Sequence, residues 1–467
     1  MEELVEHLLS CEDRIHFITG AAGTGKSYLI KLLREKNAEL ERPNDIEVLS
    51  PTASAALNVD GRTVHSFFKL PHITFHKDGT WLEDYLSRYG GRLDFSDIDI
   101  LIIDEASMIR ADLCMAVDKV LREFGGDSEQ FMGGVKVLFV GDLFQLPPVV
   151  SFGKNQKDAE KAFFADGWSD QAYFFDHLEN EGLIPDVNFH ELEKIYRQDE
   201  RNMIKCLSAI RNPVAAYRNG HVTNSKGFSN SKMVEIACDY LSSNCVGFSN
   251  SGDALSVCLT NRQVRKINED SLRELEGDLF EYRRKEIGEV RNGKEADVVP
   301  SKLELKKGAR VVFIKNHPSG VWVNGTQGVV NDLTEEVVTV RIFDNDQVVE
   351  VRHAKWDLYN YRMKDGKQEA FVEGQVTQFP LTLFFAATAH KMQGNTVSTP
   401  MNVDLSGRIF ATGQLYSILS RASKMNFLNF SRKLSPNDVK ISKRAAIFEE
   451  NLISNGCKVK LEELQKV

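Results

Sequence analysis

Long uncharged apolar runs, paired cysteines and a surplus of basic residues are all missing from this sequence. No stretch is apolar over the roughly 20 residues that a membrane-spanning helix requires. The opening MEELVEHLLSCEDR lacks the basic start and apolar stretch of a secretory signal. We therefore expect a protein with no membrane partner that stays inside the cell. Its place would be the cytoplasm or nucleoid in a bacterial or viral system, or the nucleus or mitochondrion in a eukaryote.

The cysteines and the charge balance exclude further classes. Seven cysteines, an odd number, are scattered without a CxxC pair. This favours buried reduced thiols over a disulfide framework or a structural zinc site. The net charge of −9, from 58 Lys and Arg against 67 Asp and Glu, argues against a generally basic nucleic-acid binder. It leaves room for a local basic groove.

The chain is long enough for several domains, since 467 residues exceed one ordinary core. Its first part alternates short, largely apolar strands with helices, and each strand runs into a polar motif. This pattern predicts an α/β fold, with a buried parallel sheet, helices on both faces and a ligand site at the carboxyl ends of the strands. The expected strands are Ile15–Thr19, Glu47–Ser50, Ile98–Ile103 and Val135–Val140.

Two stretches depart from this alternation. Residues 63–97 are aromatic and polar, which indicates a small insertion in the first α/β domain. Residues 286–379 contain short β-branched runs between turn signals such as Asn324-Gly325, which predicts an antiparallel β module inserted in a second α/β domain. The expected bounds are 1–187 for the first domain, 188–285 and 380–467 for the second domain with its tail, and 286–379 for the β module.

A glycine-rich turn follows the first expected strand. The segment GAAGTGKS at 20–27 fits GxxxxGK[ST] between a strand and a helix. In this motif backbone N–H groups wrap the phosphates of a nucleotide, and the helix N-terminus adds a favourable dipole. Lys26 is expected to reach the β- and γ-phosphates of ATP, and Ser27 to offer its hydroxyl to Mg²⁺. Further phosphate contacts are expected from Gly20, Gly23, Thr24 and Gly25.

Acidic and amide side chains follow two of the other strands. Asp104 is placed to hold Mg²⁺, and Glu105 to orient and deprotonate the attacking water. Gln145, in GDLFQLPP at 141–148, can hydrogen-bond a γ-phosphate or that water. Together with the phosphate loop, these residues predict ATP hydrolysis.

Taken in order, the motifs resemble those of the Pif-type, RecD-like helicases of superfamily 1B. The resemblance extends from Phe17 to about Ala422, and the FMGG element at 131–134 points to the Pif branch. The matching segments are GAAGTGKS at 20–27, SPTASAA at 50–56, TVHSFF at 63–68, IIDEASM at 102–108, FMGGVKVLFVGDLFQLPPV at 131–149, IYRQ at 195–198, VNGTQGVV at 323–330, QFPLTLFFAATAHKMQGNT at 378–396 and GQLYSILSRA at 413–422.

The resemblance implies an architecture and a set of nucleotide contacts. Two RecA-like P-loop motor domains would hold ATP between them, with an SH3-like fold for the β module. Arg197 and Arg421 would reach from the second motor domain to the γ-phosphate as arginine fingers. Tyr196 would stack on the adenine, and Gly394 would contact the nucleotide.

The resemblance also implies an activity. It is ATP-dependent unwinding of DNA with 5′ to 3′ translocation on the single strand, in DNA replication, repair or recombination. The strand-separating pin would lie in the insertion at 63–97. We expect its segment Pro71–Gly79 to be replaceable by a short Gly/Ser turn with loss of unwinding but not of ATPase activity.

A track for single-stranded and forked DNA needs phosphate ligands and flat side chains on which bases stack. Stacking or wedging is expected from Phe67, Phe68 and Pro148, with core packing an equal alternative for the two phenylalanines. The expected phosphate ligands are Thr52, His65, Ser66, Asn261, Arg262, His390 and Lys391.

Other interpretations compete with the DNA helicase. An RNA helicase, or a translocase that strips proteins without unwinding, fits the same motifs. An inactive scaffold is disfavoured because Lys26 and Glu105 are present, and a P-loop nucleotide kinase is disfavoured by the C-terminal motifs. One departure concerns adenine: family members carry a glutamine upstream of the phosphate loop, and none precedes Lys26. Either adenine is read otherwise, or nucleotide selectivity is relaxed, or the chain is shortened at its N-terminus.

Overall fold

The fold consists of two compact units in a computed structural model. Unit 1 comprises Met1–Asn244, Ile409–Met425 and Lys433–Val467, and unit 2 comprises Cys245–Arg408 and Asn426–Arg432. The structure describes residues 1–71, 73–90, 93–150, 163–169, 171–213, 230–245, 247–248, 254–288, 299–322, 324–343, 345–364, 367–393, 396–397 and 399–454.

A parallel sheet forms the centre of unit 1. Its strand order is β3-β2-β4-β5-β1-β6, and every neighbouring pair is parallel. This confirms the α/β fold class expected from the short apolar strands. The strands are β1 (Ile15–Gly20), β2 (Ile46–Ser50), β3 (Arg62–Thr63), β4 (Ile100–Ile103), β5 (Lys136–Gly141) and β6 (Val187–Leu192).

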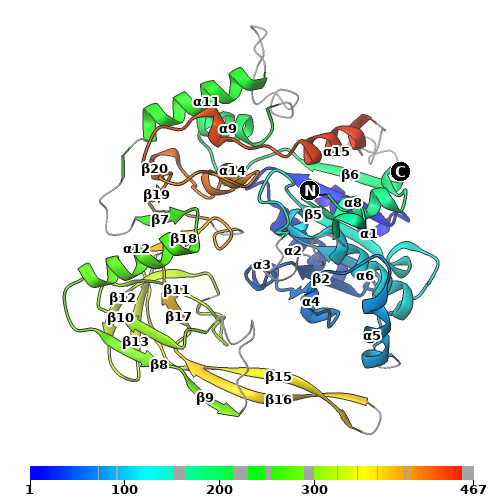
Figure 1. Cartoon of the computed structure of the whole chain (residues 1–467), viewed down its shortest axis with the longest axis horizontal. Coiled ribbons are helices and arrows are strands. Elements are labelled where there is room, and N and C mark those ends of the chain that lie inside the picture. Colours follow the sequence, from blue (N-terminus) through cyan, green and yellow to red (C-terminus); the bar gives the residue numbers. More distant parts are fainter. Residues whose placement is uncertain are drawn as a thin grey trace. The chain divides into compact units, whose positions relative to one another are not determined.

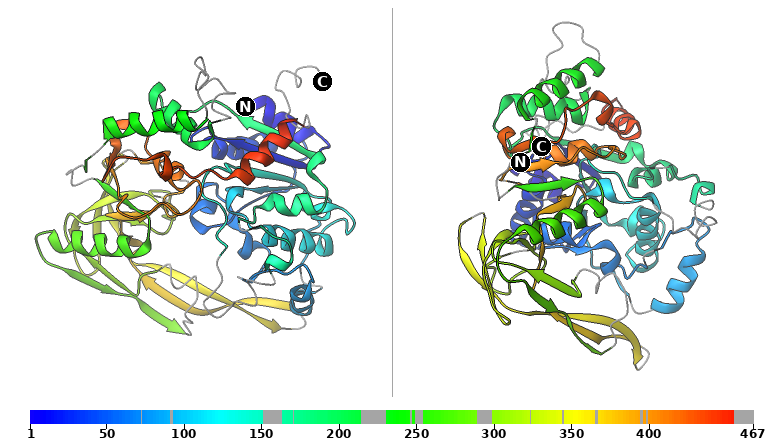
Figure 2. Two further views of the ribbon diagram at one scale, coloured as in Figure 1. Left: turned by 45° about the horizontal axis from the view of Figure 1, so that its top comes forward. Right: turned by 60° about the vertical axis from the view of Figure 1, so that its left-hand side comes forward.

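Helices cover both faces of this sheet, because successive strand residues point to opposite sides. Phe17 of β1 packs into the cluster that contains the apolar face of α6, whereas Ile18 packs with α1 and α2. Figures 1 and 2 show α2, α6 and α8 beside this sheet. The helices are α1 (Glu2–Ser10), α2 (Lys26–Ala38), α3 (Ala53–Asn58), α4 (Val64–Phe67), α5 (Thr80–Tyr89), α6 (Ala111–Phe124), α8 (Phe174–Asn180), α9 (Arg201–Arg211), α11 (Asn230–Cys245), α14 (Gln414–Leu419) and α15 (Lys443–Ser454).

The first α/β unit extends further than expected. The boundary placed at 187/188 falls at the start of β6, which pairs with β1 from Ile15↔Val187 to Gly20↔Leu192. The sequence missed this because VNFHEL mixes polar and apolar residues and does not look like a fully buried strand. Helices α9, α14 and α15 also belong to unit 1.

Segment 63–97 packs against the core of unit 1, and its role as a small insertion that carries the pin stays a prediction. Phe68 and Phe75 are both 0% exposed and pack with α6 in one cluster. The N–H of Phe75 donates to Asp112 (3.0 Å), and the hydroxyl of Tyr85 donates to the carbonyl of Phe68. The expectation that Pro71–Gly79 can be exchanged for a Gly/Ser turn at no cost to ATPase activity therefore conflicts with the anchoring of Phe75.

Unit 2 contains a second parallel sheet, of order β18-β7-β19-β20. Helix α12 (Asn261–Glu274) follows β7 directly, and Thr260 begins it with a capping box to Gln263. The sheet strands are β7 (Leu255–Cys258), β18 (Ala386–Thr388), β19 (Met401–Val403) and β20 (Leu428–Phe430).

Antiparallel strands make up the rest of unit 2, as the β-branched runs predicted. One sheet has the order β14-β13-β12-β11-β17, the long hairpin β15–β16 pairs with β9, and β10 pairs with β8 (Figure 1). The module begins before 286 and ends after 379; an SH3-like topology stays an expectation. Its strands are β8 (Phe280–Arg283), β9 (Lys285–Gly288), β10 (Lys302–Leu305), β11 (Arg310–Phe313), β12 (Gln327–Leu333), β13 (Val338–Ile342), β14 (Val348–Val351), β15 (Ala354–Lys364), β16 (Lys367–Gln378) and β17 (Leu381–Leu383).

Within the described ranges, no helix combines the length and apolar character needed to cross a bilayer.

Candidate nucleotide site

The phosphate loop begins where β1 ends. Gly23 and Gly25 have φ values of 83° and 90°, in the left-handed region that glycine adopts without strain. A Cβ atom on Gly23 would lie 2.4 Å from Cβ of Arg197. The N–H of Tyr196 donates to the carbonyl of Gly23 (2.8 Å). The loop therefore packs against segment 195–198 at a distance that only glycine allows.

Lys26 lies inside the curve of this loop. Its Nζ donates to the carbonyls of Gly20 (2.7 Å) and Ala21 (3.0 Å). Burial lowers the pKa of Lys26, while Asp142 and Glu105 act in the opposite direction. An ammonium held only by neutral carbonyls is a suitable partner for phosphate oxygens, because a charged acceptor makes a stronger hydrogen bond.

Asp104 and Glu105 follow β4, as expected. The N–H of Asp104 donates to Leu49 (2.8 Å), which fixes the strand end. Burial, and then the neighbouring Glu105, raise the pKa of Asp104 to about 7. Glu105 has φ 50° and ψ 43°, a left-handed conformation that costs a non-glycine residue energy and that often marks a functional position. Two carboxylates this close are suited to a divalent cation, which would remove their repulsion.

Asp142, directly after β5, binds two other buried polar side chains of the site. Its carboxylate accepts from Nε of Arg211 (3.0 Å) and from Nε2 of Gln145 (3.3 Å). Arg211 also lies 3.9 Å from Glu449 of α15. Burial opposes the charge of Arg211, but Asp142 and Glu449 outweigh it and raise the Arg211 pKa. Gln145 is thus held by Asp142 with its amide oxygen free for another donor.

That donor is Arg421. Its Nη2 donates to Oε1 of Gln145 (3.1 Å), and its Nε donates to the carbonyl of Ser417 (3.1 Å). Nη1 of Arg197 donates to the carbonyl of Ser420 (3.1 Å), next to Arg421. Both arginines belong to the same compact unit as Lys26. In the chain, Arg421 lies between the parallel strands β19 and β20, and an origin of the two arginines in a second motor domain stays a prediction.

The cations around the loop fit a polyanion. Burial lowers the pKa of Lys26 and Arg421, and burial together with Arg421 lowers the pKa of Arg197. Each shift is due first to burial, which disfavours the charged form. A bound triphosphate would favour the charged form again, so the residues present fit ATP. Ser27, exposed in the first turn of α2, follows Lys26 directly.

The structure places the other residues that were expected to contact the nucleotide in different environments. The ring of Tyr196 is 60% exposed, with Nζ of Lys194 over it at 4.9 Å from the ring centre. An exposed aromatic face beside the phosphate loop is suited to stacking on a base. Thr24 is buried and its hydroxyl donates to Ala21 (2.9 Å), so its side chain stabilises the loop. Gly394 lies outside the described residues.

Sequence reasoning missed three residues of this site. Asp142 was read only as part of a motif, and Arg211 only as a helix end. The hydroxyl of Tyr416 accepts a hydrogen bond from the N–H of Ala22 (2.8 Å) and so anchors α14 to the phosphate loop. A signal existed for Tyr416, which lies in the matched segment GQLYSILSRA. For Arg211, no local pattern could reveal a partner 69 positions away.

The expected DNA ligands of unit 1 lie on the loops after β2 and β3. Ser66 is exposed, and Thr52 and His65 are half-buried. The hydroxyl of Thr52 accepts from the N–H of Ala55 (3.2 Å), and Nδ1 of His65 lies 3.2 Å from the carbonyl of Leu70. These contacts orient both side chains.

The aromatic and proline candidates are more enclosed. Phe68 is in the core, so its expected stacking role is wrong. Phe67 is half-buried. The centres of the Phe67 and Phe95 rings are 5.4 Å apart, and the guanidinium carbon of Arg62 lies 4.3 Å from the centre of the Phe67 ring. Pro148 is buried. Stacking by Phe67 or Pro148 requires a base to approach the edge that remains exposed.

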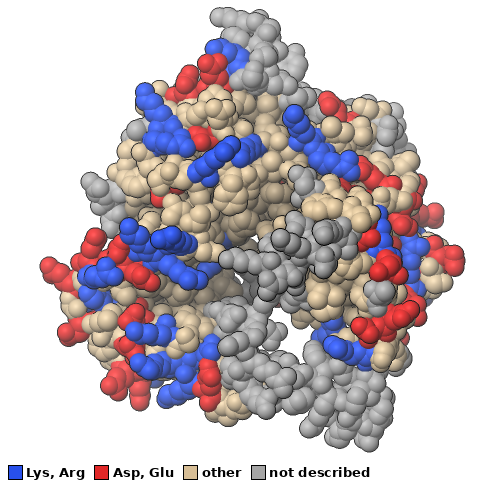
Figure 3. Space-filling view, in the orientation of Figure 1, with Lys and Arg blue, Asp and Glu red and all other residues tan. Residues whose placement is uncertain are grey.

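The expected ligands of unit 2 form a basic surface. Asn261 and Arg262 are exposed at the start of α12, and Figure 3 shows Lys and Arg side chains over this helix. Lys391 is exposed, whereas His390 is half-buried and its pKa is lowered by burial. The other exposed cations of α12 are Arg265, Lys266 and Arg273. Helix α12 therefore carries several exposed cations on a chain of acidic net charge, and their role in DNA binding stays a prediction.

Comparisons with known proteins identify relatives with the same motifs. The family model described as PIF1-like helicase matches residues 1–212. The ATP-dependent DNA helicase Pif1 of Bdellovibrio bacteriovorus is 30% identical over 409 residues, covering 87% of this chain and 81% of the relative. The human ATP-dependent DNA helicase PIF1 is 30% identical over 88% of this chain and 57% of its own length.

Solved structures agree with these relatives. The crystal structure of Bacteroides Pif1 bound to single-stranded DNA has a TM-score of 0.68 and 29% identity, and covers 98% of this chain and 97% of that one. The crystal structure of a Bacteroides Pif1 in complex with ADP-AlF4 has a TM-score of 0.70 and 29% identity, and covers 98% of each chain.

Proposed function

This chain belongs to the PIF1-like helicase family, and we propose that it couples ATP hydrolysis at the site around Lys26 to the unwinding of DNA, moving 5′ to 3′ along a single strand. The observation that carries the proposal is the bond between Arg421 and Gln145. It brings an arginine, a water-orienting amide and the phosphate loop together in one unit. That combination serves phosphoryl transfer to water.

The roles of the residues follow from their charges. Lys26, Arg197 and Arg421 neutralise the triphosphate and the charge that develops on the γ-phosphoryl group. Gln145 orients the attacking water, and Glu105 accepts its proton. Mg²⁺ would be held by Ser27 and Asp104, where it supplies charge neutralisation to the phosphates when bound. Asp142 and Arg211 position Gln145 and do not contact the nucleotide.

The fit of Mg²⁺ rests on the raised pKa of Asp104. Buried beside Glu105, this carboxyl group has a pKa of about 7 without a cation. A dication would favour the ionised form of both groups. Tyr196 stacks on the adenine, which offers base recognition without an upstream glutamine, because a flat ring accepts any purine.

Each unit contributes its own candidate ligands for DNA phosphates. In unit 1 these are Thr52, His65 and Ser66, and in unit 2 Asn261, Arg262 and Lys391 are exposed. The relative solved with single-stranded DNA and another titled for unwinding at forked duplex DNA support a single-strand or forked substrate. We assign the protein to DNA replication, repair or recombination, in the compartment that holds the DNA.

The strand-separating element is proposed at the exposed tip of segment 63–97. Ile73 is 46% exposed, and its carbonyl accepts from Nη2 of Arg110 (3.0 Å). Phe75, two residues on, is buried and fixes the tip to the core. An apolar side chain on a rigid support is what a wedge between bases requires.

Strand displacement tests this function. Duplexes with a 5′ tail, a 3′ tail or no tail are prepared in DNA and RNA, and strand separation is followed with ATP and Mg²⁺. We expect separation of the 5′-tailed DNA duplex above all others. Separation only from 3′ tails would overturn the direction, and a preference for RNA would favour the RNA helicase. ATPase activity stimulated by single strands without any separation would favour a translocase that strips proteins.

A further inference from the structure

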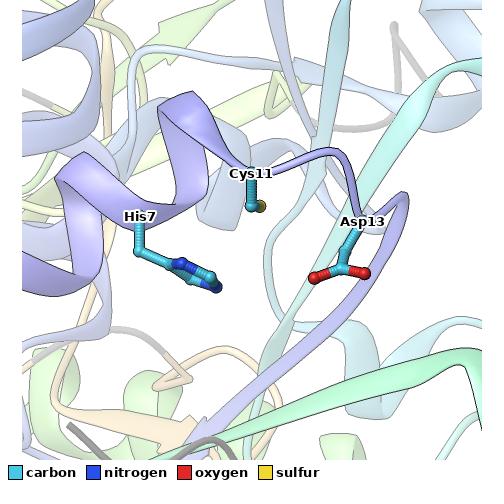
Figure 4. Close-up of side chains that lie close together, drawn as sticks. All are labelled: His7, Cys11 and Asp13. Atoms are coloured by element: carbon cyan, nitrogen blue, oxygen red, sulfur yellow. The ribbon is translucent and has the colours of Figure 1, made fainter. Parts of the chain in front are cut away.

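The amino end of β1 carries a group of polar side chains that the ATP site does not use. His7 lies in the last turn of α1, Cys11 follows the helix, and Asp13 lies in the loop that enters β1. In the described part of the chain, ligand atoms of these three residues lie within 4.8 Å of one another. Figure 4 shows the three side chains pointing into a common space.

The local backbone explains why they meet. His7 and Cys11 are four residues apart, so they share one face of the α1 end. Nζ of Lys136 donates to the carbonyls of Leu8 (2.9 Å) and Cys11 (2.6 Å), which holds the helix end in place. Nε2 of His16 lies 3.0 Å from the carbonyl of Asp13 and 3.6 Å from Sγ of Cys11. The three residues are thus fixed by a neighbouring strand on each side.

One polar atom in this group lacks a partner. Nε2 of His7 is buried and makes no hydrogen bond among the described residues. A buried imidazole nitrogen without a partner costs free energy, unless something binds it. The rings of His16 and His190 lie 6.3 Å and 5.9 Å from that of His7, edge-on, so they pack against His7 and do not bond to it.

We propose that His7, Cys11 and Asp13 bind one divalent transition-metal ion, with Zn²⁺ the best fit. An imidazole nitrogen, a thiolate and a carboxylate oxygen are the three ligand types that Zn²⁺ takes in proteins. The thiolate and the carboxylate together balance the charge of the ion. Binding releases the thiol proton of Cys11 to solvent, and a water molecule completes the tetrahedron.

The distances allow this with small movements. Metal–ligand bonds of about 2.0–2.3 Å place tetrahedral ligand atoms roughly 3.3–3.8 Å apart. The present separations of up to 4.8 Å close to that range by side-chain rotation, because Cys11 and Asp13 lie outside the helix. The bond between His16 and the carbonyl of Asp13 then acts as an outer support of a ligand residue, as is common around protein metal sites.

A metal here would be structural. It would join the end of α1 to the loop that leads into β1, the strand that carries the phosphate loop at its other end. Leu4, Val5 and Leu8 already pack α1 onto the sheet and α2. The ion would add a cross-link to this packing, and it would do so without a CxxC pair, which is why the cysteine spacing gave no sign of it.

Cobalt titration tests the site in the full chain. The protein is purified, stripped of metal, kept free of nucleotide and Mg²⁺, and titrated with Co²⁺ alone. We expect one equivalent to bind with the near-ultraviolet absorption of a thiolate–cobalt bond, and Zn²⁺ to displace it. Zn²⁺ alone should raise Tm by roughly 2–5 °C, since it binds only the folded state.

Variants assign the signal to the three ligands. Cys11→Ser should lose the thiolate–cobalt absorption, and His7→Gln and Asp13→Asn should weaken Co²⁺ binding at least tenfold (on the order of 1.4 kcal/mol). Glu12→Gln is the matched control, because it removes a neighbouring exposed carboxylate outside the group and should bind as wild type. Circular dichroism checks that each variant is folded.

Other outcomes would overturn the proposal. They are the absence of a thiolate–cobalt band in the wild type, a band that survives Cys11→Ser, or equal weakening by Glu12→Gln. None of them bears on the helicase activity, which is tested separately with ATP, Mg²⁺ and DNA.

Discussion

The buried polar groups at the two ends of β1 differ in charge. At the carboxyl end, burial lowers the pKa of Lys26, and the carboxylate of Asp142 accepts a hydrogen bond from the guanidinium of Arg211 (3.0 Å). At the amino end, burial lowers the pKa of His16 to about 4 and of His190 to about 3, so these stacked rings are neutral near pH 7.

The difference follows from what each end must do. Parallel strands bring their polar motifs together at the carboxyl edge, where phosphate chemistry requires charge. Phosphate chemistry does not take place at the amino edge, and burying a neutral imidazole costs less free energy than burying an ion. A substitution at the carboxyl end should therefore change turnover first, and one elsewhere in the unit should change stability first.

The largest expected effect comes from Lys26→Ala. Removing the ammonium should lower single-strand-stimulated ATPase activity by roughly 10³-fold or more, because the rest of the loop offers only backbone donors. Lys31→Ala is the matched control, since Lys31 lies on the same helix with its side chain 72% exposed. Steady-state phosphate release measures both, and near-normal turnover in a folded Lys26→Ala protein would refute the site.

Glu105→Gln separates binding from hydrolysis. The substitution keeps the size and polarity of the side chain but removes the proton acceptor, so turnover should fall roughly 10²–10⁴-fold. Affinity for a fluorescent ATP analogue should change little. If binding were lost as well, Glu105 would hold the nucleotide and would not be the base.

Substitution of Asp118, which lies away from both ends of β1, is expected to change the stability of the fold. Its buried carboxylate accepts from His177 (3.0 Å), Arg122 (2.9 Å) and the N–H of Met132 (2.7 Å). Asp118→Asn should lower the free energy of unfolding by about 3–5 kcal/mol at pH 7. Glu123→Gln, on the same helix, is the exposed control and should change it by under about 0.5 kcal/mol.

The effect of Asp118→Asn on the free energy of unfolding should depend on pH. Burial opposes ionisation, but the hydrogen bonds from His177 and Arg122 outweigh it, so the folded pKa of Asp118 is lowered. A lowered carboxylate pKa gives stability that is present above the unfolded value near 4 and is lost as the pH falls through the folded value. Urea unfolding should therefore show the wild-type advantage at neutral pH shrinking below about pH 4. A constant difference across pH would contradict the ionised pairing.

The smallest effect is expected at the tip of segment 63–97. Ile73→Ser should lower unwinding of a 5′-tailed duplex severalfold and leave DNA-stimulated ATPase activity unchanged, since Ile73 is exposed. Phe75→Ser should instead destabilise the fold by about 3–5 kcal/mol. Unwinding and ATPase rates measured on both variants distinguish a wedge from a core segment. Unchanged unwinding in Ile73→Ser would place the pin elsewhere.

Sequence reasoning singled out Lys26, Asp104 and Gln145 because each follows an apolar strand, whereas Arg197 and Arg421 came only from the family resemblance. Lys26, Asp104 and Gln145 follow β1, β4 and β5, and parallel pairing brings such positions together. It did not reach Arg211 or Glu449, because their partners are distant in sequence and no local pattern encodes the contact.

The composition of a segment predicted its structure less well than the position of a motif at the end of a strand predicted the site. Segment 63–97 looks like an insertion because polar residues separate its aromatics, yet Phe68 and Phe75 are spaced to reach the same core. Strand β6 was missed because His190 and Glu191 interrupt its apolar pattern. In β6, the buried His190 has its partner, His16, 174 positions away in the chain, so no local pattern reveals it.

The central claim is that hydrolysis at the carboxyl end of β1 drives strand separation, and single-turnover unwinding tests it most directly. Protein bound to a 5′-tailed DNA duplex is mixed with ATP and Mg²⁺, or with a non-hydrolysable ATP analogue and Mg²⁺, in the presence of a trap for free protein. We expect strand separation with ATP and none with the analogue, because opening each base-pair step costs about 1.4 kcal/mol that only hydrolysis can supply repeatedly. Equal separation with the analogue would contradict the account.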